Sequence, residues 1–403
     1  MPTVGFGQKD YAVSVLNTLC SDFFAGRGYV NDGVDKAASY IVNELKKNDI
    51  GPFPGHSYVQ KYHFDVNTFP HQVQVVMGND TLTAGQDYLI DPNSGKTIGE
   101  FIPIEITPQN IQKSLNTVLS GVNLRSILVF DSRTIANNDS LQNFRQLAHE
   151  ANRMLPVVWL TNQKLMYAVG RRQNKHAYLT IMGDAYKSPT SIQLTVNPLF
   201  VKQFENKNVI GFIPGKKKKK YIVLTGHYDH LGMMGKAIFP GANDNASGVA
   251  MLLSLAKHFV KTKPKYGLVF IFFSGEEAGL EGSKYFVKHP FFNLQQVRFL
   301  LNIDIMGSAS KGITAVNGTV HKKHFKLLKK INEKGRYLPT IKPRGLTQNS
   351  DHYFFSQLGV PSFFVYAMGD CKNYHDINDK AENTSLDNFD ATLNLFIDFI
   401  NKL

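Results

Sequence analysis

Two glutamates, Glu276 and Glu277, stand side by side in the stretch FIFFSGEEAGLEGS, at the point where an apolar run ends. Adjacent carboxylates repel each other, so such a pair indicates a site where something compensates the charge. Four other short motifs also carry acidic or imidazole side chains after apolar segments or before a helix. They are HYDHLG with His227 and Asp229, GANDNASG with Asp244, LNID with Asp304, and NYHDIND with His375.

Each of these residues has a plain structural role when it is considered alone. An Asp before a helix is usually an N-cap, Asp304 fits a turn at a strand end, and a lone His is more often a surface or core residue than a ligand. Two histidines and several carboxylates without Lys or Arg among them would repel one another unless a cation lay between them. The whole set therefore predicts a metal site.

The ligand types narrow the choice of metal. Mixed imidazole and carboxylate ligands without thiolate suit zinc, with manganese or cobalt as alternatives, whereas a calcium site would be nearly all oxygen. Two divalent cations are balanced by three carboxylates and one bridging hydroxide. We therefore expect two zinc ions, spaced about 3.5 to 4 Å apart as in other hydrolytic centres.

Asp229 has a different expected role. In an extended segment, positions i and i+2 share a face, so the Asp229 carboxylate can accept a hydrogen bond from the second ring nitrogen of His227, or orient the loop that holds it. We interpret His230 as a neighbour of the site and not as a ligand.

The elements that would position these residues are four continuous apolar runs. They are YIVLTG (221–226), GLVFIFF (267–273), FLLNID (299–304) and PSFFVY (361–366). Continuous apolar runs are typical of strands covered on both faces, and helical patterns lie between them. We expect an α/β fold, a three-layer sandwich with a mostly parallel central sheet, in which ligands bind at the carboxyl ends of the strands.

The rest of the chain divides into two regions. Residues 1–67 are expected to be a helical N-terminal part of the catalytic domain, with GVDKAASYIVNELKKN (33–48) as a helix after the loop DFFAGRGYVND. Residues 68–197 change to short strand-like pieces such as SILVFDS and LPVVWLTN, which predict a smaller β-rich inserted domain. Residues 198–403 would form the catalytic core.

The composition is that of a globular protein. The chain has 403 residues, 43% of them hydrophobic, which is ample for two packed domains. We find neither an apolar run of roughly 18 residues nor a signal peptide, so we expect no transmembrane segment. Cys20 and Cys371 are far apart in the sequence and are expected to be unpaired, with a disulfide as the alternative in an oxidising compartment.

The net charge of +13 raises the question of nucleic acid. The run GKKKKKY (215–221) lies between two strand-like segments, so we interpret it as a solvated hairpin turn. HKKHFKLLKK (321–330) has the pattern of an amphipathic surface helix. No Gly-rich phosphate loop or aromatic-interleaved basic stripe accompanies them, and we expect no nucleic-acid partner.

Six motifs in order resemble the co-catalytic di-zinc aminopeptidases, whose relatives include bacterial leucine aminopeptidases, plasma glutamate carboxypeptidase and the glutaminyl cyclases. The motifs are GHYDHLG, GANDNASG, FFSGEEAGLEGS, LNIDIMG, SDHYFF and YHDIND. The resemblance covers about residues 202–403, and the segment from Leu19 to Pro52 is similar to the helical start of the same domain.

The resemblance implies a role for each motif residue. Asp244 would bridge the two zinc ions, His227 and Asp304 would complete one site, and Glu277 and His375 would complete the other. A bridging metal-bound hydroxide would then attack the N-terminal peptide bond of a substrate.

The resemblance also implies the residues around the metals. Glu276 would be the general base that returns its proton to the leaving amine, and Asp229 would lie behind His227. Residues 68–197 occupy the place where some members insert a protease-associated domain. Many relatives are secreted, periplasmic or surface-anchored, so we expect export and peptide substrates; the oligomeric state is left open.

The residues that would bind substrate are less well marked. We expect Tyr366 and Tyr374, which are nearest to the loop that carries the last histidine, to stabilise the oxyanion, and we place Asp351 on the substrate side. Asn349 stands where some aminopeptidases have Arg, and this leaves recognition of the substrate's end open. No role is assigned to Cys371.

We therefore expect a metal-dependent exopeptidase, specifically an aminopeptidase. A carboxypeptidase or dipeptidase on the same metal centre is one alternative. A one-zinc glutaminyl cyclase is another, although Ser350 and Tyr374 stand where cyclases tend to have Asp and Trp. A binding module without activity is the third, and the presence of all the expected ligands argues against it.

Overall fold

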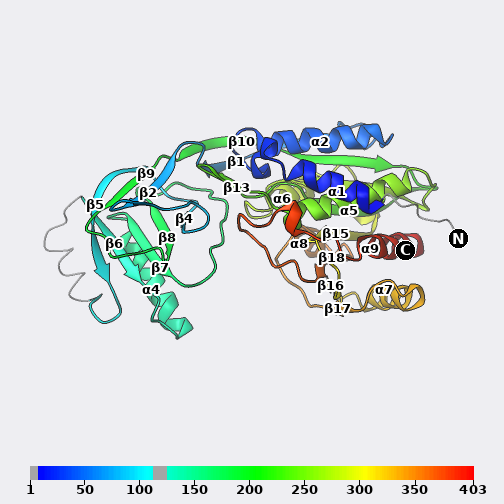
Figure 1. Ribbon diagram of the computed structural model, residues 1–403. Helices are drawn as coiled ribbons and strands as arrows, with labels where there is room; N and C mark the ends of the chain where they lie inside the picture. The colour runs from blue at the N-terminus through cyan, green and yellow to red at the C-terminus, as the bar shows by residue number, and fades with distance from the viewer. Residues whose placement is uncertain (1–7, 112–124) are drawn as a thin grey trace. The chain divides into compact units, whose positions relative to one another are not determined.

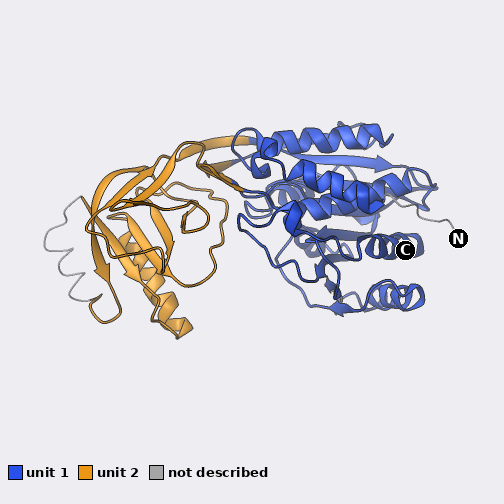
Figure 2. Cartoon of the chain, in the orientation of Figure 1, with its two compact units in different colours: residues 1–64, 205–232, 239–403 blue, residues 65–204, 233–238 orange. Residues whose placement is uncertain are grey.

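The computed structural model describes residues 8–111 and 125–403. They fall into two compact units (Figure 2). Unit 1 comprises residues 1–64, 205–232 and 239–403, and unit 2 comprises residues 65–204 and 233–238. The sequence prediction placed the inserted domain at 68–197 and did not include 233–238. That unit 2 is a protease-associated domain stays a prediction.

Unit 1 is built on an eight-stranded sheet with the order β1-β10-β14-β11-β15-β18-β16-β17. Figure 1 labels β1, β10, β15, β16, β17 and β18 of this sheet. The strands are β1 (Val59–Thr68), β10 (Leu199–Ile213), β11 (Lys217–His227), β14 (Tyr266–Phe273), β15 (Val297–Asp304), β16 (Gly312–Val316), β17 (Ile341–Pro343) and β18 (Ser362–Met368). Strand β11 is parallel to both β14 and β15, and β15 is parallel to β18. All four apolar runs that the sequence predicted as strands lie in this parallel centre.

Helices cover both faces of this sheet. They are α1 (Gln8–Leu19), α2 (Gly33–Lys47), α5 (Ser247–Phe259), α6 (Glu281–Lys288), α7 (Lys322–Gly335), α8 (His352–Gln357) and α9 (Phe389–Lys402), with short turns η1 (Asp22–Arg27), η2 (Ala242–Ala246), η3 (Leu294–Gln296) and η4 (Ala381–Asn383). Leu300 packs in one cluster with Phe286 of α6 and Phe355 of α8. The preceding residue, Phe299, contacts Phe399 of α9, with ring centroids 5.5 Å apart. Because successive strand residues point to opposite faces, this is the expected three-layer α/β arrangement.

The strand register brings the predicted site residues to one edge of the sheet. His227, the last residue of β11, is paired with Phe273, the last residue of β14. Asp304 ends β15 and is paired with Tyr366 of β18. The carboxyl ends of the parallel strands therefore meet at the same edge, which is where ligands bind in sheets of this type.

The prediction of a hairpin turn at the lysine run is wrong. Strand β14 lies between β10 and β11, pairing antiparallel with one and parallel with the other, and Lys217–Lys220 belong to β11. The connection passes the amino end of β14, where a Cβ on Gly215 would lie 2.2 Å from the backbone carbon of Tyr266. Only glycine fits this crossing, and the sequence pattern alone does not distinguish it from a hairpin.

Four further sequence predictions can be compared with the described residues. The helical pattern at 321–330 is confirmed as α7. The N-terminal part is helical only as far as α2, because residues 59–68 form the edge strand β1. Cys20 and Cys371 are both free thiols. In the part of the chain that the structure describes, we find no helix of the length and apolarity that a membrane crossing needs.

Unit 2 has its own eight-stranded sheet with the order β3-β2-β9-β5-β6-β7-β8-β4. Its elements are β2 (Val73–Met77), β3 (Asp80–Thr81), β4 (Tyr88–Ile90), β5 (Thr97–Ile106), β6 (Ser126–Asp131), α4 (Asn138–Ala151), β7 (Val157–Thr161), β8 (Tyr178–Met182) and β9 (Ile192–Val196). A separate two-stranded ribbon pairs β12 (Gly232–Met234) with β13 (Ala237–Phe239). Helix α4 packs Phe144 against Trp159 of β7.

Candidate metal centre

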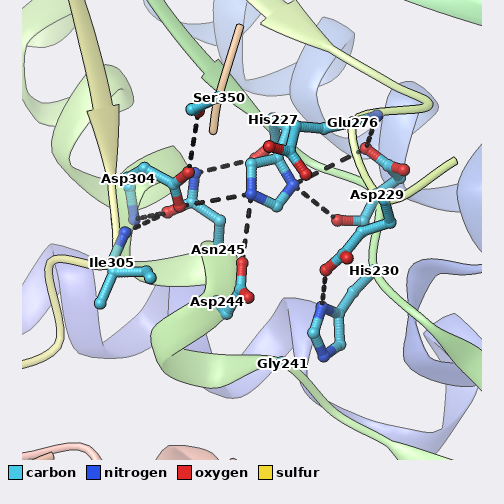
Figure 3. Close-up of polar contacts among 12 residues, drawn as sticks. His227, Asp229, His230, Gly241, Asp244, Asn245, Glu276, Asp304, Ile305 and Ser350 are labelled. Atoms are coloured by element: carbon cyan, nitrogen blue, oxygen red, sulfur yellow. Dashed lines mark hydrogen bonds and ion pairs between the residues drawn. The ribbon is translucent and has the colours of Figure 1, made fainter. Parts of the chain in front are cut away.

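Five side chains at the carboxyl ends of the strands of unit 1 lie in direct contact with one another. The Nε2 atom of His227 is 3.1 Å from Oδ1 of Asp244 and 3.3 Å from Oδ1 of Asp304 (Figure 3). The Nε2 atom of His375 is 3.2 Å from Oδ2 of Asp244 and 3.2 Å from Oε2 of Glu277. Asp244 therefore lies between the two imidazoles, with one carboxylate oxygen toward each. These are the five residues that the sequence assigned to metal binding.

The turn η2, before helix α5, holds Asp244 in place. The carboxylate of Asp379 accepts hydrogen bonds from the backbone amides of Asn243 at 2.8 Å and Asp244 at 3.0 Å. The side-chain amide of Asn245 donates to the carbonyl oxygens of His227 and Ile303, at 3.3 and 3.2 Å. The turn is thereby tied to the ends of both β11 and β15.

Arg27, at the end of η1, lies behind the same loops and is completely buried. Its guanidinium donates to the backbone carbonyls of Tyr228 at 2.9 Å, Pro240 at 2.6 Å and Gly241 at 2.6 Å. It also donates to the carbonyl of Leu19 at 3.2 Å. One planar side chain therefore joins the loop that follows His227 at the end of β11 to the loop that precedes η2, the turn that contains Asp244.

A chain of hydrogen bonds fixes Asp304. The Ser350 hydroxyl donates to Oδ2 of Asp304 at 3.1 Å, and the amide of Asn302 donates to Ser350 at 2.8 Å. Thr225 of β11 donates in turn to Asn302 at 2.7 Å. This leaves Oδ1 of Asp304 without a hydrogen-bond partner of normal geometry among the described residues, and it points toward His227.

Asp229 lies beside His227, but its carboxylate has other partners. Nδ1 of His227 lies 3.0 Å from the backbone oxygen of Asp229 and 3.7 Å from its carboxylate. The carboxylate accepts hydrogen bonds from the Tyr29 hydroxyl at 2.9 Å and from the backbone amide of Glu276 at 3.3 Å. Asp229 therefore fixes His227 through its backbone, and its side chain connects that loop to the start of the glutamate loop.

His230 is closer to the site than the sequence indicated. Its Nδ1 atom lies 2.7 Å from Oε1 of Glu277, and the ring is fully buried. Gly241 makes room for it, because a Cβ at that position would lie 2.3 Å from the His230 ring (Figure 3). His230 thus orients Glu277 from the side opposite His375.

The two histidines and their carboxylate partners have strongly shifted pKa values. Burial alone would lower the pKa of His227, but the charges of Asp304 and Glu276 outweigh it and raise the pKa well above its usual value. For His375, the carboxylates of Glu277 and Asp244 likewise overcome burial and raise the pKa to about 11. Each imidazole is thus held in a field that favours a positive charge at its position.

The pKa values of the two adjacent glutamates are shifted in opposite directions. Burial raises the pKa of Glu277, but contact with His375 and His230 overcomes it and lowers the pKa to about 2. Burial raises the pKa of Glu276 well above its usual value, and the charge of Glu277 adds to this effect against the opposing influence of His227. One glutamate is thus held as a carboxylate and the other has a higher affinity for a proton.

The geometry fits a zinc centre. Zinc bound tetrahedrally at about 2.0 to 2.1 Å places neighbouring ligand atoms about 3.3 to 3.4 Å apart. The four imidazole–carboxylate distances here are 3.1 to 3.3 Å. Within the described ranges, no Lys or Arg forms an ion pair with Asp244, Glu277 or Asp304. A pair of divalent cations would supply the missing positive charge.

The geometry brings together two overlapping sets of possible ligands. His227, Asp244 and Glu277 form one group in which the ligand atoms all lie within 4.8 Å of one another. His227, Glu276 and Asp304 form a second group by the same measure. The Glu276 carboxylate therefore lies within 4.8 Å of ligand atoms of His227 and Asp304, and its role as a base stays a prediction.

The three residues predicted to bind substrate have different surroundings. The Tyr374 ring is 40% exposed and stacks on His375, with centroids 3.9 Å apart. The Tyr366 hydroxyl accepts a hydrogen bond from Arg344 at 3.5 Å. Asp351 is fully buried, and burial raises its pKa to about 7. Tyr374 is thus the one of the three that lies in the open beside a predicted ligand.

Sequence reasoning did not find the residues that hold the ligands. Arg27 lies in a segment that we interpreted as a loop, about 200 positions before its partners. Ser350, Asn302 and Asp379 are polar residues next to motifs, and their types alone do not indicate which backbone or side-chain groups they contact. The one available signal was the unusual placement of a single Arg between two glycines in AGRG, before a helix.

Comparison with curated proteins gives partial matches. A probable leucine aminopeptidase of Arthroderma otae is 29% identical over 180 residues, which cover 41% of this chain and 48% of that protein. A vacuolar membrane protease of Candida glabrata is 23% identical over 226 residues, which cover 55% of this chain and 22% of that protein. The chain thus spans less than half the length of these relatives.

Comparison with solved structures covers nearly the whole chain. BSAP, a zinc aminopeptidase from Bacillus subtilis, matches with a TM-score of 0.73 at 18% identity, over 99% of this chain and 95% of that chain. This similarity confirms the α/β fold expected from the sequence. The family model described as Peptidase family M28 matches residues 208–400, the part of unit 1 that carries all five predicted ligands. The resemblance to zinc peptidases is therefore confirmed, and residues 208–400 of this chain form a Peptidase family M28 domain.

Proposed function

We propose that this chain is a zinc-dependent aminopeptidase with two zinc ions held by His227, Asp244, Glu277, Asp304 and His375. The observation that carries the proposal is the position of Asp244, whose two oxygens lie 3.1 and 3.2 Å from two different imidazoles. A carboxylate shared in this way suits a residue that bridges two cations. The M28 domain match over 208–400 supports the same assignment.

Zinc, when bound, supplies a Lewis acid that polarises the scissile carbonyl and lowers the pKa of water. The protein's own part is proton transfer and positioning. Glu276 has a raised pKa and is half-buried, so its carboxylate can accept a proton during attack and return it to the leaving amine. Tyr374, exposed beside His375, is placed to donate a hydrogen bond to the oxyanion.

The charge of the site favours the amino end of a peptide. Glu276 lies near the predicted ligands and is an acidic group beyond the three carboxylates that would balance two zinc ions. In its ionised form this carboxylate attracts the α-ammonium group of a substrate. The relative named a probable leucine aminopeptidase agrees with this preference.

Zinc content and activity on matched substrates test the proposal. The chain, stripped with a chelator and reloaded, should bind two zinc ions, measured by mass spectrometry of the metal. Release of nitroaniline from leucyl-p-nitroanilide should follow zinc occupancy. N-acetyl-leucyl-p-nitroanilide, which lacks the ammonium group, should be cleaved at least about 100-fold more slowly. Equal cleavage of both substrates, or one bound zinc, would contradict the assignment.

A second candidate function rests on Arg344. This exposed guanidinium donates to Tyr366, whose strand position is paired with Asp304. A cation there suits the carboxylate at the free end of a short peptide, as a dipeptidase or carboxypeptidase would need. Leu-Gly and its C-terminal amide separate the two functions. A dipeptidase prefers the free acid, and Arg344→Gln should remove that preference, whereas an aminopeptidase shows little difference.

Glutaminyl cyclase activity is the other alternative for this metal centre. A glutaminyl cyclase would bind one zinc ion and cyclise an N-terminal glutamine, so metal stoichiometry and a glutaminyl substrate distinguish it.

We also propose that the chain acts outside the cytosol, in line with the relative named a vacuolar membrane protease. For unit 2 we propose a protease-associated role, tested by whether its deletion changes the preference for longer peptides.

A further inference from the structure

The amino ends of the central strands of unit 1 form a strongly basic surface. Three segments meet there, 214–221, 260–266 and 293–298, and they contain nine Lys and Arg residues but no Asp or Glu. All nine side chains are exposed. We call them the basal basic face: Lys216, Lys217, Lys218, Lys219, Lys220, Lys261, Lys263, Lys265 and Arg298.

Backbone and side-chain contacts make this one continuous surface. The amide of Lys217 donates to the carbonyl of Lys265 at 2.9 Å. The ammonium of Lys265 lies 4.8 Å from the ring centroid of Tyr266, and the guanidinium carbon of Arg298 lies 5.4 Å from the same ring. A hydrogen bond from Lys265, and the charge of Arg298, lower the pKa of Tyr266. Among the described residues, no acidic side chain forms an ion pair with any member of the face.

An apolar groove borders the basal basic face. It has a volume of about 730 Å³, and Lys216 and Lys263 are among the residues that line it. Its apolar lining consists of Pro52, Pro54, Phe212, Ile213, Pro214 and Val260. The acidic member of its lining is Asp49. The backbone of Gly51 also lines the groove, and a Cβ there would meet no atom within 4 Å, so the space above it is open.

We propose that the basal basic face docks unit 1 onto the surface of a bilayer that contains anionic phospholipid. The lysines would contact the headgroup phosphates, and the groove would receive the apolar part of a lipid. Charge complementarity carries this choice, because unpaired cations on one surface attract a negatively charged leaflet. The groove favours a lipid over a nucleic acid, since a nucleic acid has no apolar chain to fill it.

The two ends of the sheet make docking compatible with catalysis. Strand β11 begins at Lys217 on the basal basic face and ends at His227 in the metal centre. At about 3.3 Å per residue, these ends are about 33 Å apart. A bilayer bound at the basal basic face therefore leaves the metal centre facing the aqueous phase, open to peptides.

Sedimentation with vesicles tests the electrostatic part. The chain should bind vesicles of phosphatidylcholine with 30% phosphatidylglycerol, and not vesicles of phosphatidylcholine alone. Replacing four lysines (K217Q, K218Q, K219Q and K220Q) should lower the partition coefficient at least about tenfold. The matched control replaces four exposed lysines of unit 2 (K175Q, K187Q, K202Q and K236Q) and should change it less than about twofold. Thermal unfolding shows that both variants are folded.

A groove variant tests the apolar part. Gly51→Leu places a side chain in the open space of the groove, and its backbone carbonyl still accepts from the amide of Phe212. Binding to anionic vesicles should fall about three- to tenfold with an unchanged salt dependence. Unchanged binding would overturn the role of the groove. Equal loss in the two four-lysine variants, or binding of oligouridine without binding of vesicles, would overturn the proposal as a whole.

Discussion

The two ends of the central sheet of unit 1 carry opposite charges and are built in opposite ways. At the carboxyl ends, Asp244 and Glu277 are almost completely excluded from solvent and are held by several hydrogen bonds. At the amino ends, the lysines of the basal basic face are exposed and have no described acidic partner. The same strands therefore supply a buried, fixed cluster and an exposed, unpaired one.

This difference is what the two proposed roles would require. A metal centre needs ligand atoms held to within a few tenths of an ångström, and the predicted ligands and their loops have partners such as Asp379, Ser350 and His230. A surface that attracts a broad negative charge needs only number and exposure, since its cations act over a Debye length of about 8 Å. Substitutions should therefore have large, specific effects at the carboxyl ends of the strands and small, additive effects at the basal basic face.

The largest expected effect is on turnover. Glu276→Gln removes the proposed base and should lower kcat by about 10²- to 10⁴-fold, while zinc content stays unchanged. The matched control is Glu281→Gln, five residues later, whose carboxylate is partly exposed and pairs with Lys284. The measurement is kcat on leucyl-p-nitroanilide together with the zinc content of both variants. Near-normal kcat in Glu276→Gln would show that another residue is the base.

The buried and exposed arginines give the next comparison. Arg27→Met leaves at least three backbone carbonyls without their donor and should lower the free energy of unfolding by about 3 kcal/mol or more. Arg298→Met, in the basal basic face, should change it by less than about 0.5 kcal/mol. Urea unfolding of both variants measures the difference. Equal stability losses would mean that the fixed loops around Asp244 do not depend on Arg27.

The structure brings the five predicted ligands together because the sequence prediction depended on residue type and on the ends of strands, and their binding of metal stays a prediction. His227, Asp244, Asp304 and His375 are recognisable from the strands and helix that precede or follow them, and the apolar runs of β14 and β15 identify a buried parallel sheet. What it did not predict depends on contacts between distant segments. The path of the lysine run past β14, beside Gly215, is one example, because a hairpin and a crossing have the same local pattern.

The next expected effect is on the pH dependence of the free energy of unfolding. In the metal-free protein, burial raises the pKa of Asp351 to about 7, above the usual value of about 3.9 in an unfolded chain. The unfolded state therefore releases this proton first, and the residue reduces stability progressively as pH rises from about 4 to about 7. Asp351→Asn should remove this pH dependence. The free energy of unfolding of the variant should therefore rise relative to that of the wild type between about pH 4 and pH 7, and the difference between the two should stay constant above pH 7. A constant difference between pH 5 and 7.5 would contradict the buried, proton-binding Asp351.

The smallest expected effect is at the basal basic face. Lysines about 8 Å apart repel each other by about 0.5 kcal/mol per pair in water, and salt screens this repulsion. Raising the salt concentration from about 20 mM to 300 mM should therefore increase the stability of the wild type by about 1 kcal/mol. The variant in which Lys217 to Lys220 are Gln should show less than half of this increase, with unchanged zinc content and unchanged turnover of a soluble substrate. Because the two ends of the sheet are joined only by buried strands, a loss of zinc in this variant would mean that the basal basic face also supports the metal centre.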